Sequence, residues 1–182
     1  EGSAFEDFLQ PDRVVIGSDD EVAAQTVERL HQNIVAPRVL TTLESAELIK
    51  YAANAFLATK ISFINEIANL ADRVGADVRH VAEGIGHDHR IGPHFLRAGV
   101  GYGGSCFPKD VSALEQISGA NGYSFKLLSA VIEVNNRQRE IFFKRMMEKL
   151  GGVKGRRVTV WGLAFKAHTD DIRESAGIEI AQ

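Results

Sequence analysis

Cysteine is almost absent from this sequence, because Cys106 is the only one among 182 residues. A single thiol excludes an intramolecular disulfide and the multi-thiolate site of a structural zinc ion. The six histidines show no metal-ligand spacing, and the nearest pair, His87 and His89, lies in a glycine-flanked loop where we expect both rings to be solvated. We therefore expect no metal site, and any chemistry of Cys106 is that of a lone thiol.

The sequence also lacks a long apolar run and an excess of one charge. No apolar stretch approaches the roughly 18 residues of a membrane span, and residues 1–13 lack the basic start and apolar core of a signal peptide. The net charge of −3 provides no basic surface for nucleic acid. With 45% hydrophobic and 25% charged residues, the composition predicts a globular, cytoplasmic protein that binds neither membrane nor nucleic acid.

The first part of the chain has the pattern of an α/β unit. Residues 13–17 and 38–42 predict short buried strands, and the apolar stripe over 20–33 predicts a helix between them. A strand–helix–strand unit implies a parallel sheet. The first residues carry no initiation or capping signal, so we expect this unit to be the tail of a domain truncated on its N-terminal side.

The middle of the chain is predicted to be all helical. Apolar residues follow helical spacing from Ser45, a plausible N-cap, to Gly75, and their wide surface indicates burial on more than one side and a helix–helix interface. Shorter helices are expected after Asp77 and at or near Asp110, and a second long helix over 124–150.

After the glycine-rich break at 151–155 the pattern returns to α/β. Residues 157–163, RVTVWGL, predict a buried strand, and a further helix is expected to begin at Glu174 or Ser175. The predicted fold class is therefore mixed, with an all-α central domain flanked by partial α/β domains.

The segment from Gly99 to Asp110, GVGYGGSCFPKD, contains the dinucleotide-binding pattern G-x-G-x-x-G. That pattern binds a dinucleotide only where it joins a buried strand to a helix and an acidic residue follows about twenty positions later. Here the preceding GPHFLRA is too short and polar for a central strand, and the acidic residue is missing. The glycines are better explained as a backbone that turns sharply and approaches a ligand closely, delivering Cys106 to the start of a helix.

At a helix N-terminus with Lys109 nearby, the Cys106 thiol is placed to act as a nucleophile. Asp110 lies four residues later on the same helical face, where it could serve a water beside the sulfur or simply cap the helix. Lys50 and Asn54 have the same spacing in the long helix, and they form either a solvated edge or an ammonium and an amide aimed at a developing oxyanion. Spacing alone does not decide between the two interpretations of Asp110, or between the two interpretations of Lys50 and Asn54.

Four segments together resemble the UDP-glucose/GDP-mannose dehydrogenases, a family of nucleotide-sugar oxidoreductases, over essentially the whole chain. They are EGSAFEDFLQPDRVVIG, SAELIKYAANAFLATKISFINEIANLAD, RIGPHFLRAGVGYGGSCFPKD and WGLAFKAHTDDIRES. SCFPKD is similar to the UDP-glucose branch, whereas GDP-mannose relatives more often have leucine after the cysteine and N-acetylhexosamine relatives a histidine before it.

The resemblance implies three domains. Residues 1–43 would be the end of a Rossmann-like NAD-binding domain, 44–151 a central helical domain that forms a homodimer, and 152–182 the start of a Rossmann-like UDP-binding domain. The implied reaction oxidises the C6 alcohol of UDP-glucose twice, to UDP-glucuronate, with two NAD and one water through a cysteine-bound thiohemiacetal and thioester. The resemblance leaves room for GDP-mannose or a UDP-N-acetylhexosamine as substrate. A purely helical, non-catalytic dimerisation module is the alternative from another class.

The resemblance also assigns roles to individual residues. Cys106 would be the nucleophile, Asp110 would serve the water, and Lys50 with Asn54 would place the reacting oxygens. The implied substrate-binding residues are Arg90, which would reach the partner subunit's substrate, and Phe95, Leu96, Arg97, Gly99, Tyr102, Gly103, Phe165 and Lys166. Glu1, Lys109 and Arg173 would bind NAD. Because the NAD-binding glycine turn would precede residue 1, the 182-residue chain is expected to be inactive alone.

Overall fold

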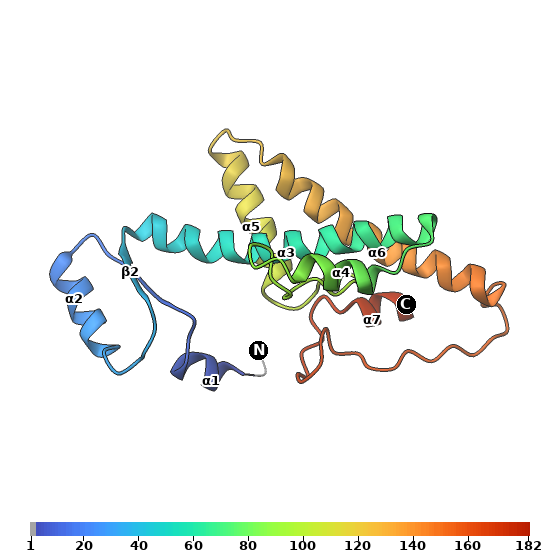
Figure 1. Ribbon diagram of the computed structural model, residues 1–182, viewed down its shortest axis with the longest axis horizontal. Coiled ribbons are helices and arrows are strands. Elements are labelled where there is room, and N and C mark those ends of the chain that lie inside the picture. The colour runs from blue at the N-terminus through green and yellow to red at the C-terminus, as the bar shows by residue number, and fades with distance from the viewer. Residues whose placement is uncertain (1–2) are drawn as a thin grey trace. The chain divides into compact units, whose positions relative to one another are not determined.

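The computed structural model describes residues 3–182, which form seven helices and two strands (Figure 1). The chain divides into two compact units, Glu1–Ala53 and Asn54–Gln182. Among the described residues, no helix is both long and apolar enough to cross a bilayer.

The first unit contains the predicted strand–helix–strand arrangement. Strands β1 (Val14–Gly17) and β2 (Arg38–Thr41) pair in parallel and are joined through helix α2 (Glu21–Leu30). Asp20 caps α2 by accepting a hydrogen bond of 2.9 Å from the Ala23 amide. A six-residue helix, α1 (Ala4–Leu9), precedes the strands. The prediction of a parallel pair is thus confirmed.

Helix α3 (Leu43–Val74) runs from the first unit into the second. The prediction that Ser45 is its N-cap is wrong: the helix already begins at Leu43, and the Ser45 amide donates to Thr42 Oγ1 at 3.3 Å. Thr42 therefore takes the capping role, since its hydroxyl accepts from a first-turn amide. The predicted end at Gly75 is confirmed, because this glycine has the left-handed φ of 74° that closes many helices.

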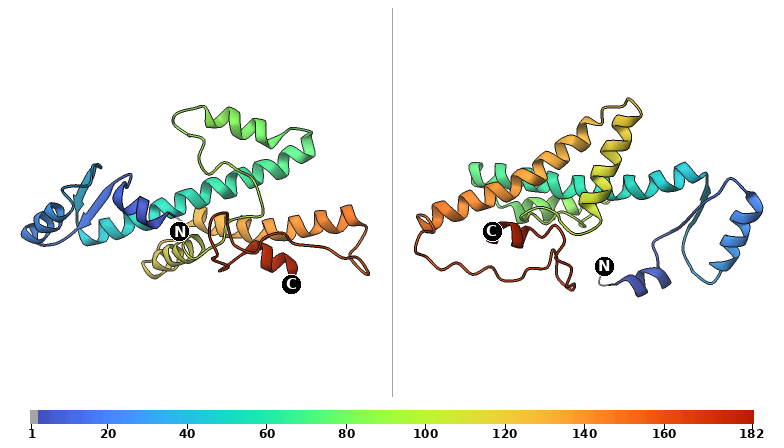
Figure 2. Two further views of the ribbon diagram at one scale, coloured as in Figure 1. Left: turned by 90° about the horizontal axis from the view of Figure 1, so that it is seen from below. Right: turned by 180° about the vertical axis from the view of Figure 1, so that it is seen from behind.

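The second unit is built from the rest of α3 and four further helices: α4 (Val78–Gly86), α5 (Phe107–Ala120), α6 (Lys126–Leu150) and α7 (Ala176–Ala181). Asp77 caps α4, as predicted, by accepting from the Arg79 amide. Helices α5 and α6 form a hairpin around the turn at 121–125 (Figures 1 and 2).

Helix α3 contacts α6 through a small polar side chain next to buried alanines. Ala55, Ala58 and Ser62 are buried along one face of α3, and the Ser62 hydroxyl donates to the carbonyl of Val131 in α6 at 3.2 Å. Ile64 and Leu128 are almost completely buried, and burial of such a side chain contributes about 1.5–3 kcal/mol. The sequence therefore builds its core from one alanine-rich helix face.

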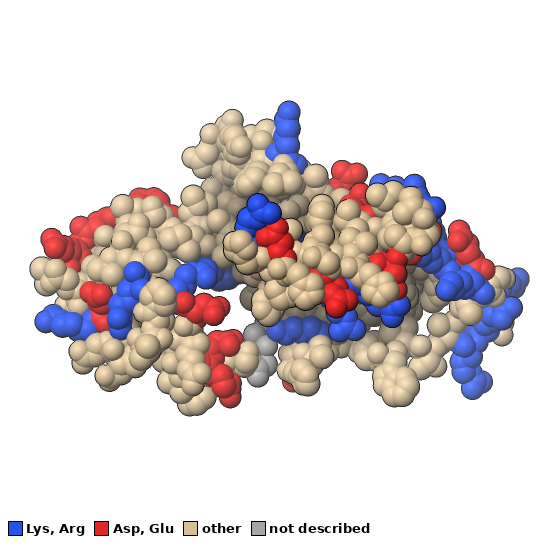
Figure 3. Space-filling model, viewed as in Figure 1, with Lys and Arg blue, Asp and Glu red and all other residues tan. Residues whose placement is uncertain are grey.

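A polar clamp fixes the far ends of the same two helices. In α6, Arg145 forms an ion pair of 2.6 Å with Asp72 of α3 and donates to Asn69 Oδ1 at 3.0 Å. Basic side chains gather at this C-terminal end of α6 and in the turn that follows (Figure 3). The clamp fixes the register of α6 along α3.

The predicted strand at 157–163 is wrong. These residues carry no regular secondary structure, and the Trp161 side chain is 97% exposed. A strand is stabilised by a ladder to a neighbour, and among residues 3–182 the only ladder joins β1 to β2. The expected helix start is confirmed, since α7 begins at Ala176 after Ser175. A Rossmann-like fold of either flank remains a prediction.

Candidate active site

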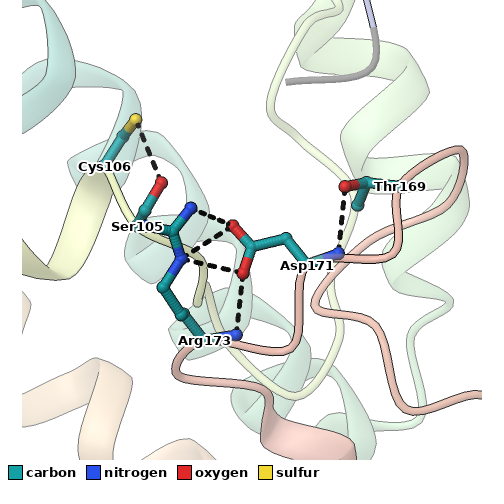
Figure 4. Close-up of polar contacts among 5 residues, drawn as sticks. All are labelled: Ser105, Cys106, Thr169, Asp171 and Arg173. Atoms are coloured by element: carbon teal, nitrogen blue, oxygen red, sulfur yellow. Dashed lines mark hydrogen bonds and ion pairs between the residues drawn. The ribbon is translucent and has the colours of Figure 1, made fainter.

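Cys106 is an exposed free thiol at the N-cap position of α5 (Figure 4). Pro108 lies in the first turn, where it fixes the backbone without removing a needed amide donor. The Ser105 hydroxyl lies 3.7 Å from the Cys106 sulfur. The glycine loop thus presents the thiol at a helix N-terminus.

Asp110, one turn into α5, is buried, with 3% of its surface exposed. Asn54 of α3 donates to its Oδ2 at 2.6 Å, and the Lys109 ammonium lies 2.9 Å from its Oδ1. Because the helix begins at Phe107, Asp110 is not its cap, and the capping interpretation is wrong. Asp110 is thus a buried carboxylate held by an amide and an ammonium, one helical turn from Cys106.

The glycine loop is fastened to two helices by buried amides. Asn65 of α3 accepts from the Gly99 amide at 2.8 Å, and Gln138 of α6 donates to the Gly99 carbonyl at the same distance. Asn135 binds the backbone of Tyr102 further along the loop. Sequence analysis missed these three residues, although polar Asn135 and Gln138 continue the stripe of Leu128 and Val131 at helical spacing.

Aromatic side chains pack around the residue after the thiol. Phe95 and Tyr102 lie 6.1 Å and 5.9 Å from Phe107, measured between ring centroids. Burial raises the pKa of Tyr102 to about 12. Phe95 has a left-handed φ of 64°, which is costly for a bulky residue and is concentrated at functional sites. Leu96 beside it is buried.

The segment 165–174 packs directly against the glycine loop. The Gly104 amide donates to the Arg173 carbonyl at 2.9 Å. A Cβ on Gly103 would stand 2.0 Å from the Glu174 carbonyl oxygen, and one on Gly104 would stand 2.6 Å from the Phe165 ring. The Lys166 ammonium lies 5.5 Å from the centroid of that ring. The structure therefore brings Gly103, Phe165 and Lys166 together.

Lys109 and Arg173 line one pocket of about 520 Å³ beside this contact. Arg173 is paired with Asp171 at 2.7 Å, which holds its guanidinium in place (Figure 4). Tyr102, Ser105 and Arg139 also line the pocket. Glu174 lines the pocket too, and each basic side chain is paired with a carboxylate: Lys109 with Asp110, Arg173 with Asp171 and Arg139 with Glu179.

Other predicted site residues lie elsewhere. Arg90 is paired with Asp88 at 2.6 Å, and this hydrogen-bonded guanidinium lowers the pKa of Asp88. Arg97 lines a separate pocket against α4. Lys50 is exposed in the first unit, where it lines a pocket with residues 10–13. Glu1 lies outside the described residues.

The arrangement around Cys106 has the parts of covalent catalysis by a thiol. A nucleophile needs access, a partner that handles protons or water, and a wall that places the substrate. Here Cys106 is accessible, Asp110 is a buried carboxylate one helical turn further on, and Phe165 packs on the glycine loop.

Known proteins resemble this chain over its whole length. Residues 44–137 match the UDP-glucose/GDP-mannose dehydrogenase family, central domain. The chain is 57% identical over 180 residues to UDP-glucose 6-dehydrogenase TuaD of Bacillus subtilis, covering 99% of this chain and 39% of that protein. It is 48% identical over 186 residues to UDP-glucose 6-dehydrogenase of Pseudomonas aeruginosa, covering 100% of this chain and 41% of that one.

Solved structures give the same relationship. A UDP-glucose dehydrogenase from Pyrobaculum islandicum superposes with a TM-score of 0.97 at 48% identity, covering 100% of this chain and 42% of that one. A UDP-D-ManNAc dehydrogenase from Pyrococcus horikoshii gives 0.85 at 28% identity, covering 98% and 43%. The chain thus spans about two fifths of the length of these relatives. With more than half of its residues matching the central domain, the chain belongs to the UDP-glucose/GDP-mannose dehydrogenase family.

Proposed function

We propose that this chain carries the central catalytic part of an NAD-dependent UDP-glucose 6-dehydrogenase, which converts UDP-glucose to UDP-glucuronate. The observation that carries the proposal is the exposed Cys106 thiol at the start of α5 with the buried Asp110 carboxylate one turn behind it. The choice of UDP-glucose rests on relatives of 57% and 48% identity that bear this name.

The proposed reaction uses the thiol to hold the sugar between two oxidations. NAD, when bound, accepts one hydride from C6 in each oxidation. After the first, the Cys106 sulfur adds to the aldehyde carbon and forms a thiohemiacetal, whose hydroxyl proton is released as the second hydride leaves. The resulting thioester is hydrolysed by one water, which gives the carboxylate and restores the thiol.

Asp110 is proposed to orient the hydrolytic water and to receive its proton. Its carboxylate is fixed by Asn54 at 2.6 Å and by Lys109 at 2.9 Å, so its orientation is settled before a substrate binds. Asn54, whose amide is held on the Asp110 carboxylate, is proposed to stabilise the oxygen at C6.

The remaining polar residues are assigned to the two nucleotides. Lys109 and Arg173 line one pocket, and their charges fit the phosphates of NAD. The substrate is proposed to lie against the glycine loop, Phe165 and Lys166. Arg90 is proposed to reach the substrate of a second subunit.

We further propose that the protein is a homodimer through α3. Phe56, Phe63 and Leu70 recur every seven residues along one face, and they are 66%, 52% and 55% exposed. An apolar stripe of this kind on a helix is typical of a helix–helix interface. A second copy presenting the same stripe would cover it symmetrically.

The test is product analysis with the protein expressed from its full reading frame. UDP-glucose and NAD should give UDP-glucuronate and two NADH per sugar. Cys106→Ser should stop the second oxidation or accumulate an ester-linked sugar, whereas Gln116→Ala, at an exposed amide in α5, should leave turnover unchanged. Normal UDP-glucuronate production by Cys106→Ser would refute the thioester mechanism. Turnover of GDP-mannose or a UDP-N-acetylhexosamine instead would change the substrate assignment.

A further inference from the structure

Asn135 of α6 grips the backbone of a single residue in the glycine loop. Its Oδ1 accepts from the Tyr102 amide at 2.7 Å, and its Nδ2 donates to the Tyr102 carbonyl at 3.2 Å. The side chain is buried, with 4% of the residue exposed. A carboxamide that satisfies both backbone groups of one residue acts on the loop as a strand neighbour would, and a buried amide left unsatisfied is costly.

Gly101, the residue before Tyr102, leaves the space that the Asn135 side chain occupies. A Cβ at Gly101 would stand 2.6 Å from Asn135 Oδ1, and the residue has a φ of 97°. The glycine is therefore required twice, by its backbone conformation and by the closeness of the Asn135 oxygen. The loop is built around this one amide.

Tyr102 connects the grip to the nucleophile. Its ring packs edge-on against Phe107, the residue after Cys106, with 5.9 Å between ring centroids. Arg139 also donates to the Tyr102 carbonyl, at 3.2 Å. The carbonyl therefore keeps a donor if the amide of Asn135 is lost, whereas the Tyr102 amide depends on Asn135 Oδ1. The hydrogen bond that matters is therefore the one that Asn135 Oδ1 accepts from the Tyr102 amide.

We propose that Asn135 is a positioning residue for catalysis: by accepting from the Tyr102 amide it fixes the glycine loop, and through it the place of the Cys106 sulfur. The inference rests on the proposed function for its kinetic consequence, but its structural part stands on contacts that need no substrate. A nucleophile displaced by about 1 Å can lose on the order of a hundredfold in rate.

The kinetic test compares two substitutions that differ in the acceptor. Asn135→Leu, which has no acceptor, should lower kcat by about 10- to 100-fold. Asn135→Asp keeps the acceptor but turns a second oxygen toward the Tyr102 carbonyl, so its kcat should fall clearly less than that of Asn135→Leu. Equal kcat values for Asn135→Leu and the unaltered protein, or a loss that simply follows the unfolded fraction at the assay temperature, would overturn the proposal.

A second variant covers the case in which Asn135→Leu does not fold. Gly101→Ala pushes the loop away from Asn135 while leaving α6 intact, and it should lower kcat as Asn135→Leu does. Unchanged kcat in Gly101→Ala would contradict the inference.

Hydrogen exchange of the Tyr102 amide in the unaltered chain separates this inference from the proposed function. The amide should be protected, and Asn135→Asp should preserve that protection. Exchange as fast as in an exposed loop would refute the hydrogen bond from the Tyr102 amide to Asn135, even if turnover is normal. If the unaltered protein shows no turnover of any sugar nucleotide, the proposed function fails, and the exchange result still decides whether Asn135 holds the loop.

Discussion

At the scale of single residues, burial determines which partners two side chains near the glycine loop need, those of Asp110 and Tyr102. Asp110 is a carboxylate removed from water, and it is compensated by Asn54 and Lys109. Tyr102 is a phenol removed from water, and its neutral form is favoured. A buried charge requires partners, whereas a buried phenol can remain protonated.

Tyr102 leads to a prediction about alkaline pH. Its pKa is about 12 in the folded chain against an ordinary value of 10.0. The stabilisation from the neutral phenol is therefore fully present below about pH 10 and is lost as the pH rises from about 10 to 12. Absorbance of tyrosinate during alkaline titration should show a late step that Tyr102→Phe removes. Titration complete by about pH 10.5 would contradict the burial of this phenol.

At the scale of elements, the contact between the glycine loop and segment 165–174 depends on glycines, which have no side chain to keep the two backbones apart. Gly103 approaches the Glu174 carbonyl so closely that no Cβ fits, and backbone cannot move aside as a flexible side chain can. Glu174 itself has a left-handed φ of 51°. The two segments therefore hold each other in conformations that neither would adopt alone.

Gly103→Ala should accordingly lower the free energy of unfolding by about 1–3 kcal/mol. The matched control is Gly119→Ala in α5, where the added Cβ meets nothing within 4 Å. That change should be neutral or stabilise the chain by up to about 1 kcal/mol, because alanine is the better helix former. Urea unfolding followed by circular dichroism measures both, and equal stabilities of the two variants would show that the loop contact does not form.

At the scale of the whole molecule, an apolar stripe on α3 remains uncovered within a single chain. Phe63 lies at its centre and is 52% exposed. Phe63→Glu should weaken a dimer by at least about tenfold in dissociation constant, since a charge would be buried without a partner. Arg137→Glu, an exposed charge reversal on α6, is the control and should leave association unchanged.

Sedimentation equilibrium over a range of concentrations measures this effect. A chain that sediments as a monomer before any substitution would refute the homodimer, and an unchanged dimer in Phe63→Glu would place the interface on another surface.

The sequence by itself determined the elements whose signals are local. Asp77 capping α4, Gly75 ending α3 and the alternation of strand and helix over 13–42 depend on neighbours a few residues away. The glycines before Cys106, followed by a proline, likewise marked the thiol as a residue presented at a helix start.

Only the tertiary structure decided which residues that are far apart in the sequence contact each other. Spacing left Asp110 as a possible cap, and only the structure shows that the helix begins at Phe107 and that Asn54, 56 positions away, donates to the Asp110 carboxylate. Asn65, Asn135 and Gln138 look in sequence like interruptions of an apolar face, and their partners are loop backbone atoms that no local pattern predicts. The apolar run at 157–163 has strand composition, but a strand also needs a neighbouring ladder. Hydrogen bonds between segments depend on the packing of the whole chain, whereas caps and turns depend on the adjacent residues.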